Sequence, residues 1–266
     1  MSSVAYLLVA HGSRDRRYQI ALERLADWVS QALSAEAVAS ISPASMATPG
    51  LSPTLSVRTA VLECHPLPLH QQIAAIAQDL AQQGYQTLRI VPLFLGLGVH
   101  LREDLPREID QARRFSPMVL TQDTALGEMP GLKSLIAQPL IPDARIPKIL
   151  IAHGSRRAGG NTPIETLANH LGMHTAYWSD PHWPSVITAL LSSHPPGMQI
   201  IPYVLFAGGI TEAIAQKIAN WQKAYPHVLL SMGQPLGATP ALAPLIAQTL
   251  IHGLPTTISE QQKPIG

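Results

Sequence analysis

The sequence LLVAHGSR at residues 7–14 returns as ILIAHGSR at residues 149–156, 142 positions further along the chain. In each copy a short apolar run ends abruptly in His-Gly-Ser-Arg. Such a run is typical of a buried β-strand, and glycine permits the tight turn that would leave the histidine at the edge of the sheet. The repeat therefore predicts a duplicated domain, with His11 and His153 at equivalent positions.

The duplication extends beyond this octapeptide. RIVPLFLGLG at residues 89–98 matches QIIPYVLFAGG at 199–209, and ALGEMPGLKSLI at 125–136 matches PLGATPALAPLI at 235–246. These matches are offset by 110 residues instead of 142, so the first half carries 32 additional residues. We assign most of this surplus to residues 34–56, which are rich in Ala, Ser, Pro and Thr and lack an amphipathic period. This segment is expected to form a surface insertion, and we favour a dispensable loop over a lid.

Apolar strand-like runs alternate with helical patterns in both halves. Strands are expected at residues 4–10, 57–62, 87–94 and 118–122, and again at 148–152, 174–178, 199–206 and 228–231. Between them, apolar residues keep the spacing of amphipathic helices. The alternation predicts an α/β protein of two tandem domains, each a parallel four-stranded sheet with helices on both faces, with a cleft between the domains. The proline-rich stretch 138–147 divides residues 1–140 from residues 141–266.

The composition restricts the class of protein. Hydrophobic residues make up 46% of the 266 residues and charged residues only 13%, which favours packed domains over a disordered chain. A net charge of +1, without runs of Lys and Arg, gives no indication of nucleic-acid binding. No apolar stretch approaches the ~20 residues of a membrane span. Because Cys64 is the single cysteine, no internal disulfide can form, and we expect a cytoplasmic protein with no membrane partner.

Three side chains of the first half are expected at the carboxyl edge of its sheet. His11 follows the first strand, Glu63 the second and His100 the third. Two imidazoles and a carboxylate at one edge could bind a divalent metal or accept protons near neutral pH. The structural alternative is a capping histidine or a solvated glutamate at a strand end. The neighbouring Cys64 and His65 are interpreted as packing or surface residues, because adjacent strand residues point to opposite faces.

Several arginines lie near the two histidines in the sequence, namely Arg14, Arg16, Arg17 and Arg102. Guanidinium groups can clamp the carboxylates of a ligand, and solvated surface arginines are the equally weighted alternative. His70 is expected on the exposed side of its helix.

These motifs resemble those of the sirohydrochlorin chelatases, the class II tetrapyrrole chelatases of cobalamin and sirohaem synthesis. The resemblance rests on AHGSRD at residues 10–15, on a strand that ends in Glu63 and on VPLFLGLGVHLREDLP at residues 91–106, and it covers nearly the whole chain. It implies insertion of Co2+ or Fe2+ into sirohydrochlorin, a flexible, carboxylate-rich macrocycle that would lie in the cleft. It also implies that His11 and His100 bind the metal and take part in proton removal, with no cofactor beyond the substrate metal ion.

The second half departs from this pattern. Ile210 or Thr211 stands where the first half has His100, and Ser179 or Asp180 where it has Glu63. We therefore expect the second half to form only the opposite wall of the cleft, in a monomer whose two halves mimic a dimer.

Two other functions compete with metal insertion. A carrier would bind the metal or the tetrapyrrole without turnover. A phosphate-handling hydrolase would use the loop after His11 as an anion site, but the Ala10 that precedes this histidine disfavours it.

Overall fold

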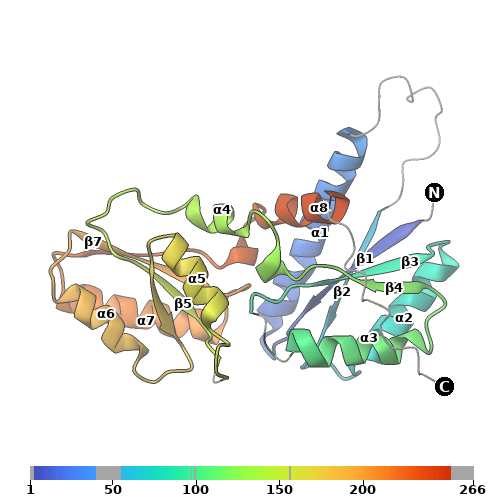
Figure 1. Cartoon of the computed structure of the whole chain (residues 1–266), viewed down its shortest axis with the longest axis horizontal. Helices are drawn as coiled ribbons and strands as arrows, with labels where there is room; N and C mark the ends of the chain where they lie inside the picture. The colour runs from blue at the N-terminus through green and yellow to red at the C-terminus, as the bar shows by residue number, and fades with distance from the viewer. Residues whose placement is uncertain (1–2, 40–54, 97, 99, 156, 253–266) are drawn as a thin grey trace, which may run out of the picture.

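The computed structural model describes residues 3–39, 55–96, 98, 100–155 and 157–252. It contains two four-stranded parallel sheets, which Figure 1 shows beside each other. The first has the order β2-β1-β3-β4 and is built from β1 (Val4–Ala10), β2 (Ser56–Val61), β3 (Thr87–Pro92) and β4 (Val119–Gln122). The second has the order β6-β5-β7-β8 and is built from β5 (Lys148–Ala152), β6 (His174–Tyr177), β7 (Gly197–Tyr203) and β8 (Leu229–Met232). The predicted α/β architecture with two duplicated sheets is confirmed.

α-Helices follow the strands in both halves. In the first half they are α1 (Arg16–Ala39), α2 (Leu69–Gln82), α3 (Leu105–Arg113) and α4 (Leu132–Ala137). In the second half they are α5 (Thr162–His170), α6 (Trp183–Leu191), α7 (Gly209–Ala224) and α8 (Leu242–His252). Every helix in the described part of the chain is too short or too polar to cross a bilayer.

The apolar strands are buried on both faces, as parallel strands covered by helices must be. Successive residues of β1 alternate between the faces. Leu7 packs in one cluster with Ile73 of α2 and Ile109 of α3, whereas Leu8 packs in another cluster with Leu25 of α1. All these side chains are fully buried or nearly so. This two-sided burial explains why the strands read as continuous apolar runs in the sequence.

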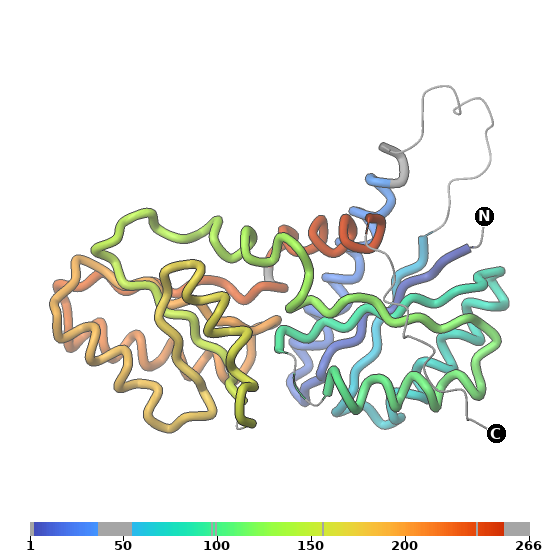
Figure 2. The backbone as a smooth tube through the Cα atoms, in the orientation of Figure 1, coloured from blue at the N-terminus to red at the C-terminus, as the bar shows by residue number. Residues whose placement is uncertain are grey.

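The last helix of each half packs against the other half. In Figures 1 and 2, α8 lies along α1, whereas α4 lies over the second sheet. Leu132 of α4 belongs to the same hydrophobic cluster as Leu150 of β5, Leu25 of α1 and Ile246 of α8. One cluster thus runs through both halves, so the boundary at residues 138–147 divides the sequence without dividing the core.

The predicted insertion at residues 34–56 differs from the structure at both ends. The helix α1 continues to Ala39, and β2 begins at Ser56, whose side chain is buried. Residues 40–54 lie outside the described residues. The prediction is wrong at residues 34–39 because Ala and Glu, two strong helix formers, prolong α1 into a segment whose overall composition is typical of a loop.

Candidate metal centre

The carboxyl ends of three neighbouring strands bring the predicted ligands together. Glu63 follows β2, His11 follows β1 and His100 follows β3 by eight residues, and their ligand atoms all lie within 4.8 Å of one another. The two imidazole rings meet edge to face, with centroids 4.7 Å apart and planes at 86°. Since the chain passes from β1 to β2 on one side and then to β3 on the other, this is the switch point at which α/β sheets usually bind ligands. Two imidazoles and a carboxylate suit a first-row divalent metal.

The glycine of the HGSR motif allows the ends of β1 and β2 to approach. Gly12 has a φ of 101°, and a Cβ at this position would lie 2.1 Å from the carbonyl oxygen of Glu63. The N–H of Glu63 donates to the carbonyl of His11 at 2.8 Å. Glycine alone combines this left-handed backbone with this close approach. The motif thus places His11 beside Glu63.

His100 begins a π-helical turn, His100–Asp104, that leads directly into α3. Its Nδ1 lies 2.9 Å from Oδ2 of Asp104, and Arg107 donates to Oδ1 of the same carboxylate at 3.0 Å. Turns of this kind are rare and occur often at functional sites. Asp104 is not among the residues predicted from the sequence, although its spacing of four residues from His100 is the signal of a helical neighbour.

His11 and His100 line a cavity of about 650 Å³ between the two halves. Its size is in the range of small-molecule sites. Tyr18 of α1 contributes to the wall and meets Phe206 of the second half edge to face, with ring centroids 4.9 Å apart. Burial raises the pKa of the Tyr18 phenol, although hydrogen bonds with the backbone of Gly12 and His11 oppose the shift. The expected cleft between the halves is therefore present.

The second half supplies the opposite wall but not a second set of ligands. Ser179 occupies the place of Glu63, because its N–H donates to the carbonyl of His153 at 2.9 Å. Ile210 and Thr211 both line the cavity, and the Thr211 hydroxyl is bound to the backbone of Gly208. Among the described residues, the cluster of His11, Glu63 and His100 is the one group that meets the geometry of a metal site.

The predicted arginines do not belong to the described lining of this cavity. Arg14, Arg16, Arg17 and Arg102 are all exposed, and no arginine stands among the described residues of the cavity wall. Their binding of substrate carboxylates stays a prediction.

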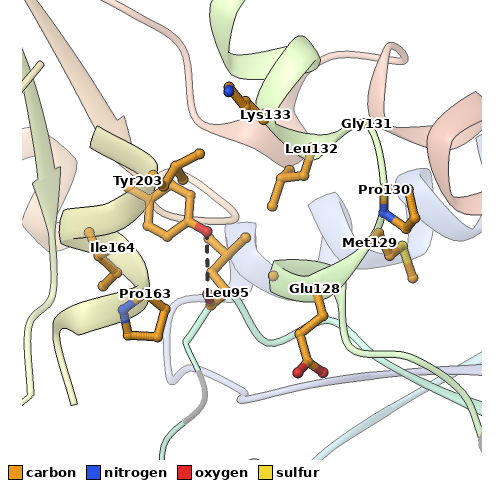
Figure 3. A pocket seen from close by; sticks show the side chains of 12 residues that line it. Leu95, Glu128, Met129, Pro130, Gly131, Leu132, Lys133, Pro163, Ile164 and Tyr203 are labelled. Atoms are coloured by element: carbon orange, nitrogen blue, oxygen red, sulfur yellow. Dashed lines mark hydrogen bonds between the residues drawn. The ribbon is translucent and has the colours of Figure 1, made fainter. Parts of the chain in front are cut away.

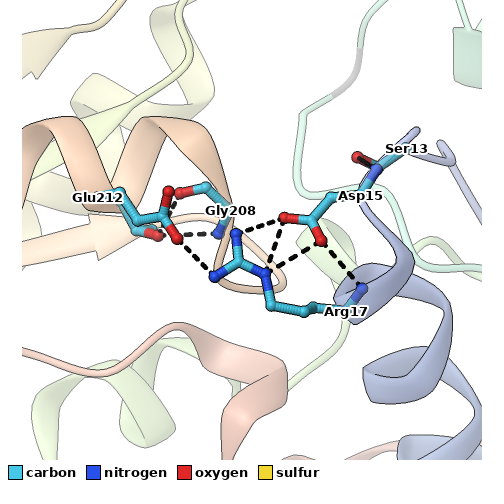
Figure 4. A network of polar contacts seen from close by, with 6 residues as sticks. Ser13, Asp15, Arg17, Gly208 and Glu212 are labelled. Atoms are coloured by element: carbon cyan, nitrogen blue, oxygen red, sulfur yellow. Dashed lines mark hydrogen bonds and ion pairs between the residues drawn. The ribbon is translucent and has the colours of Figure 1, made fainter.

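Arg17 is already held by two carboxylates. Its guanidinium contacts Asp15 and, across the two halves, Oε1 of Glu212 at the start of α7, with an Nη1–Oε1 distance of 2.5 Å (Figure 4). Hydrogen bonds from Arg17 hold the pKa of Asp15 below its ordinary value. This network lies next to Ser13 and Gly208, which line the cavity.

A smaller cavity of about 240 Å³ adjoins the first (Figure 3). Tyr203 lines both cavities, and its hydroxyl donates to the carbonyl of Leu95 at 3.3 Å. Burial raises the pKa of Tyr203 to about 12. Charged side chains in the wall of the small cavity are Glu128 and Lys133.

Two other predictions concern residues after Glu63. Cys64 and His65 are exposed in the turn after β2, in agreement with their interpretation as surface residues. The exposed position predicted for His70 is wrong, because its Nδ1 lies 2.8 Å from Oε2 of Glu108 and its side chain is only 21% exposed. Glu108 belongs to α3, which packs against α2. The spacing of apolar residues in α2 does not show that α3 covers the side of the helix that carries His70.

The family model named CbiX matches residues 5–141 and 147–252. The chain belongs to the CbiX family. The matched segments fall one in each half, and they separate within the proline-rich stretch 138–147.

Individual relatives agree with this assignment. A sirohydrochlorin cobaltochelatase from Sulfurisphaera tokodaii is 31% identical over 78 residues, which are 29% of this chain and 51% of that protein. The chain thus matches about half the length of this curated relative. The predicted membership of the sirohydrochlorin chelatase family is confirmed.

Solved structures show the same fold over most of the chain. SirB from Bacillus subtilis with Fe3+ has a TM-score of 0.67 at 20% identity, and the matched region covers 95% of this chain and 95% of SirB. A structure described as CbiX, the terminal enzyme for biosynthesis of siroheme in denitrifying bacteria, has a TM-score of 0.59 at 23% identity and covers 94% of this chain and 99% of its own. At these identities the likeness concerns the fold.

Proposed function

We propose that the protein inserts a divalent metal ion, Co2+ or Fe2+, into sirohydrochlorin. The proposal is carried by the convergence of His11, Glu63 and His100 within 4.8 Å, where the two histidines line a cavity of about 650 Å³. The names of the relatives, which include a cobaltochelatase and an enzyme of siroheme biosynthesis, support the same substrate class.

The reaction replaces two N–H protons of the macrocycle by one divalent metal ion, so the site must hold the metal and receive protons. A neutral imidazole can do either, because its free nitrogen is both a metal ligand and a proton acceptor. We assign these duties to His11 and His100. Glu63 is exposed, so it can also pass a proton from the site to solvent.

The macrocycle would occupy the cavity, with its carboxylates toward the exposed arginines. Arg14, Arg16 and Arg102 are the proposed contacts, because guanidinium groups bind carboxylates in a bidentate manner. Arg17 could join them only if a substrate carboxylate replaced that of Glu212. In this arrangement residues 1–140 supply the chemistry and residues 141–266 the second wall, within a single chain.

Turnover distinguishes the proposed enzyme from a carrier. The purified protein is mixed anaerobically with a large excess of metal-free sirohydrochlorin and with either Co2+ or Fe2+, and the absorption spectrum of the macrocycle is followed against a control without protein. Conversion of many equivalents per protein is expected. A spectral change that stops at one equivalent would identify a carrier and contradict the proposal. Parallel initial rates identify the preferred metal.

A further inference from the structure

Asp104 is the last residue of the π-helical turn that leads into α3, and its backbone is helical, with φ −70° and ψ −50°. Its carboxylate makes no hydrogen bond to the start of α3. One oxygen faces Nδ1 of His100 at 2.9 Å, and the other accepts from Arg107 at 3.0 Å. Both carboxylate oxygens are thus engaged by side chains, one by the imidazole of His100 and the other by Arg107.

This contact determines which nitrogen of His100 carries the proton. An ionised carboxylate only accepts hydrogen bonds, so Nδ1 must be the donor. In the neutral ring, Nε2 then keeps its lone pair. Histidine ligands of metals in proteins are commonly oriented by a carboxylate in this way.

The ring of His11 is held differently. Within the described residues it meets the ring of His100 but makes no hydrogen bond to another side chain or to the backbone. Neither of its nitrogens is therefore engaged by a hydrogen bond from the described residues. The two histidines of the candidate site thus differ in their surroundings.

We propose that Asp104 is a positioning residue that locks His100 in its Nδ1–H tautomer and so presents Nε2 to the metal. The inference rests on the proposed function, in which His100 binds the substrate metal. It makes the two imidazoles unequal: His100 is anchored by a carboxylate, whereas the ring of His11 is held by no hydrogen bond from the described residues.

The tautomer can be measured directly. In the full-length, metal-free protein labelled with 15N-histidine, NMR distinguishes Nδ1–H from Nε2–H in the neutral ring of His100, and wild type is expected to show Nδ1–H. In Asp104→Asn, Arg107 retains the amide oxygen and turns the NH2 group toward Nδ1, so the Nε2–H form is expected. Asp104→Ala removes the acceptor and should also lose the preference for Nδ1–H.

Co2+ binding provides the second readout. Titration with Co2+ alone, followed by its visible absorption, should give a Kd raised by about 10–100-fold in Asp104→Asn and Asp104→Ala. Asp110→Asn is the matched control, because Asp110 is an exposed aspartate of the same helix that also pairs with an arginine three residues later, Arg113. Its Kd and its His100 tautomer should equal those of wild type.

Two results would overturn the proposal. One is an Nε2–H tautomer of His100 in the wild-type protein. This result does not depend on whether any variant folds. The other is an Asp104→Asn protein that keeps both the Nδ1–H form and the wild-type Co2+ affinity. Neither measurement uses sirohydrochlorin, so a protein that passes both tests but gives no turnover would refute the proposed function and leave the positioning role intact.

Discussion

Among the described glycines, Gly12 leaves the least room for a side chain. Its φ is 101°, and a Cβ at this position would lie 2.1 Å from the carbonyl oxygen of Glu63. No side chain fits here unless the backbone moves. Gly12→Ala is therefore expected to push His11 away from Glu63 and to abolish Co2+ binding, as measured by titration with the metal.

Gly84→Ala is the matched control for this change. Gly84 has a similar φ of 91°, but nothing lies within 4 Å of the position of a Cβ. The left-handed backbone alone should lower the free energy of unfolding by about 1–2 kcal/mol, with Co2+ binding intact. Equal Co2+ affinities in the two variants would show that the contact between Gly12 and Glu63 does not position the site.

For single residues, the sequence predicts the candidate metal ligands better than it predicts ion pairs between the two halves. His11, Glu63 and His100 can be found because each follows a strand, and the carboxyl ends of parallel strands meet at one edge. The contact of Arg17 with Glu212 spans 195 positions of the sequence, and the pairing depends on how the two halves pack. Local sequence patterns do not predict such long-range packing.

Among the elements, β3 and α8 are joined by a buried guanidinium. Arg89 forms a two-pronged ion pair with Asp123 and donates to the carbonyl of Leu250 in α8 at 2.8 Å. The two charged side chains are only 14% and 5% exposed. Arg89→Ala leaves the Asp123 carboxylate buried and unpaired, so the free energy of unfolding, measured in urea, should fall by about 3–5 kcal/mol.

Arg145→Ala tests whether burial is the cause. Arg145 also pairs with an aspartate, Asp143, but its side chain is 79% exposed. Because water screens such a pair, the free energy of unfolding should stay unchanged within error. A comparable loss in both variants would show that the ion pair of Arg89 does not owe its effect to burial.

The sequence predicts the elements themselves with few errors. Continuous apolar runs locate the strands because these strands are covered on both faces. The extension of α1 to Ala39 is missed because helix propensity acts residue by residue, whereas the composition of the longer segment 34–56 is typical of a loop. The sequence also does not predict that α4 and α8 each pack against the other half. Both helices belong to repeated motifs, and the sequence of such a motif does not show which sheet its helix covers.

For the whole molecule, the shared hydrophobic cluster predicts that the two halves remain together when the link between them is cut. Cleavage near Asp143, in the proline-rich stretch 138–147, should give two fragments that sediment as one particle. Its mass should be that of one intact chain, 28.6 kDa. Separate fragments would contradict a common core, and a stable dimer of the intact protein at micromolar concentration would contradict the proposed monomer.

The two halves share a fold but differ in chemistry. His153 occupies the position of His11, yet Ser179 stands where the first half has Glu63, and Ile210 or Thr211 where it has His100. The duplication therefore explains the shape of the cavity, and the first half alone is proposed to supply the reacting groups.

This asymmetry is tested most directly by metal insertion into sirohydrochlorin with three alanine variants. His11→Ala and His100→Ala are expected to lose nearly all activity, because each removes an imidazole from the cluster, whereas His153→Ala should keep most of it. Circular dichroism of each variant checks that the fold is intact. Equal losses in all three folded variants would contradict the account.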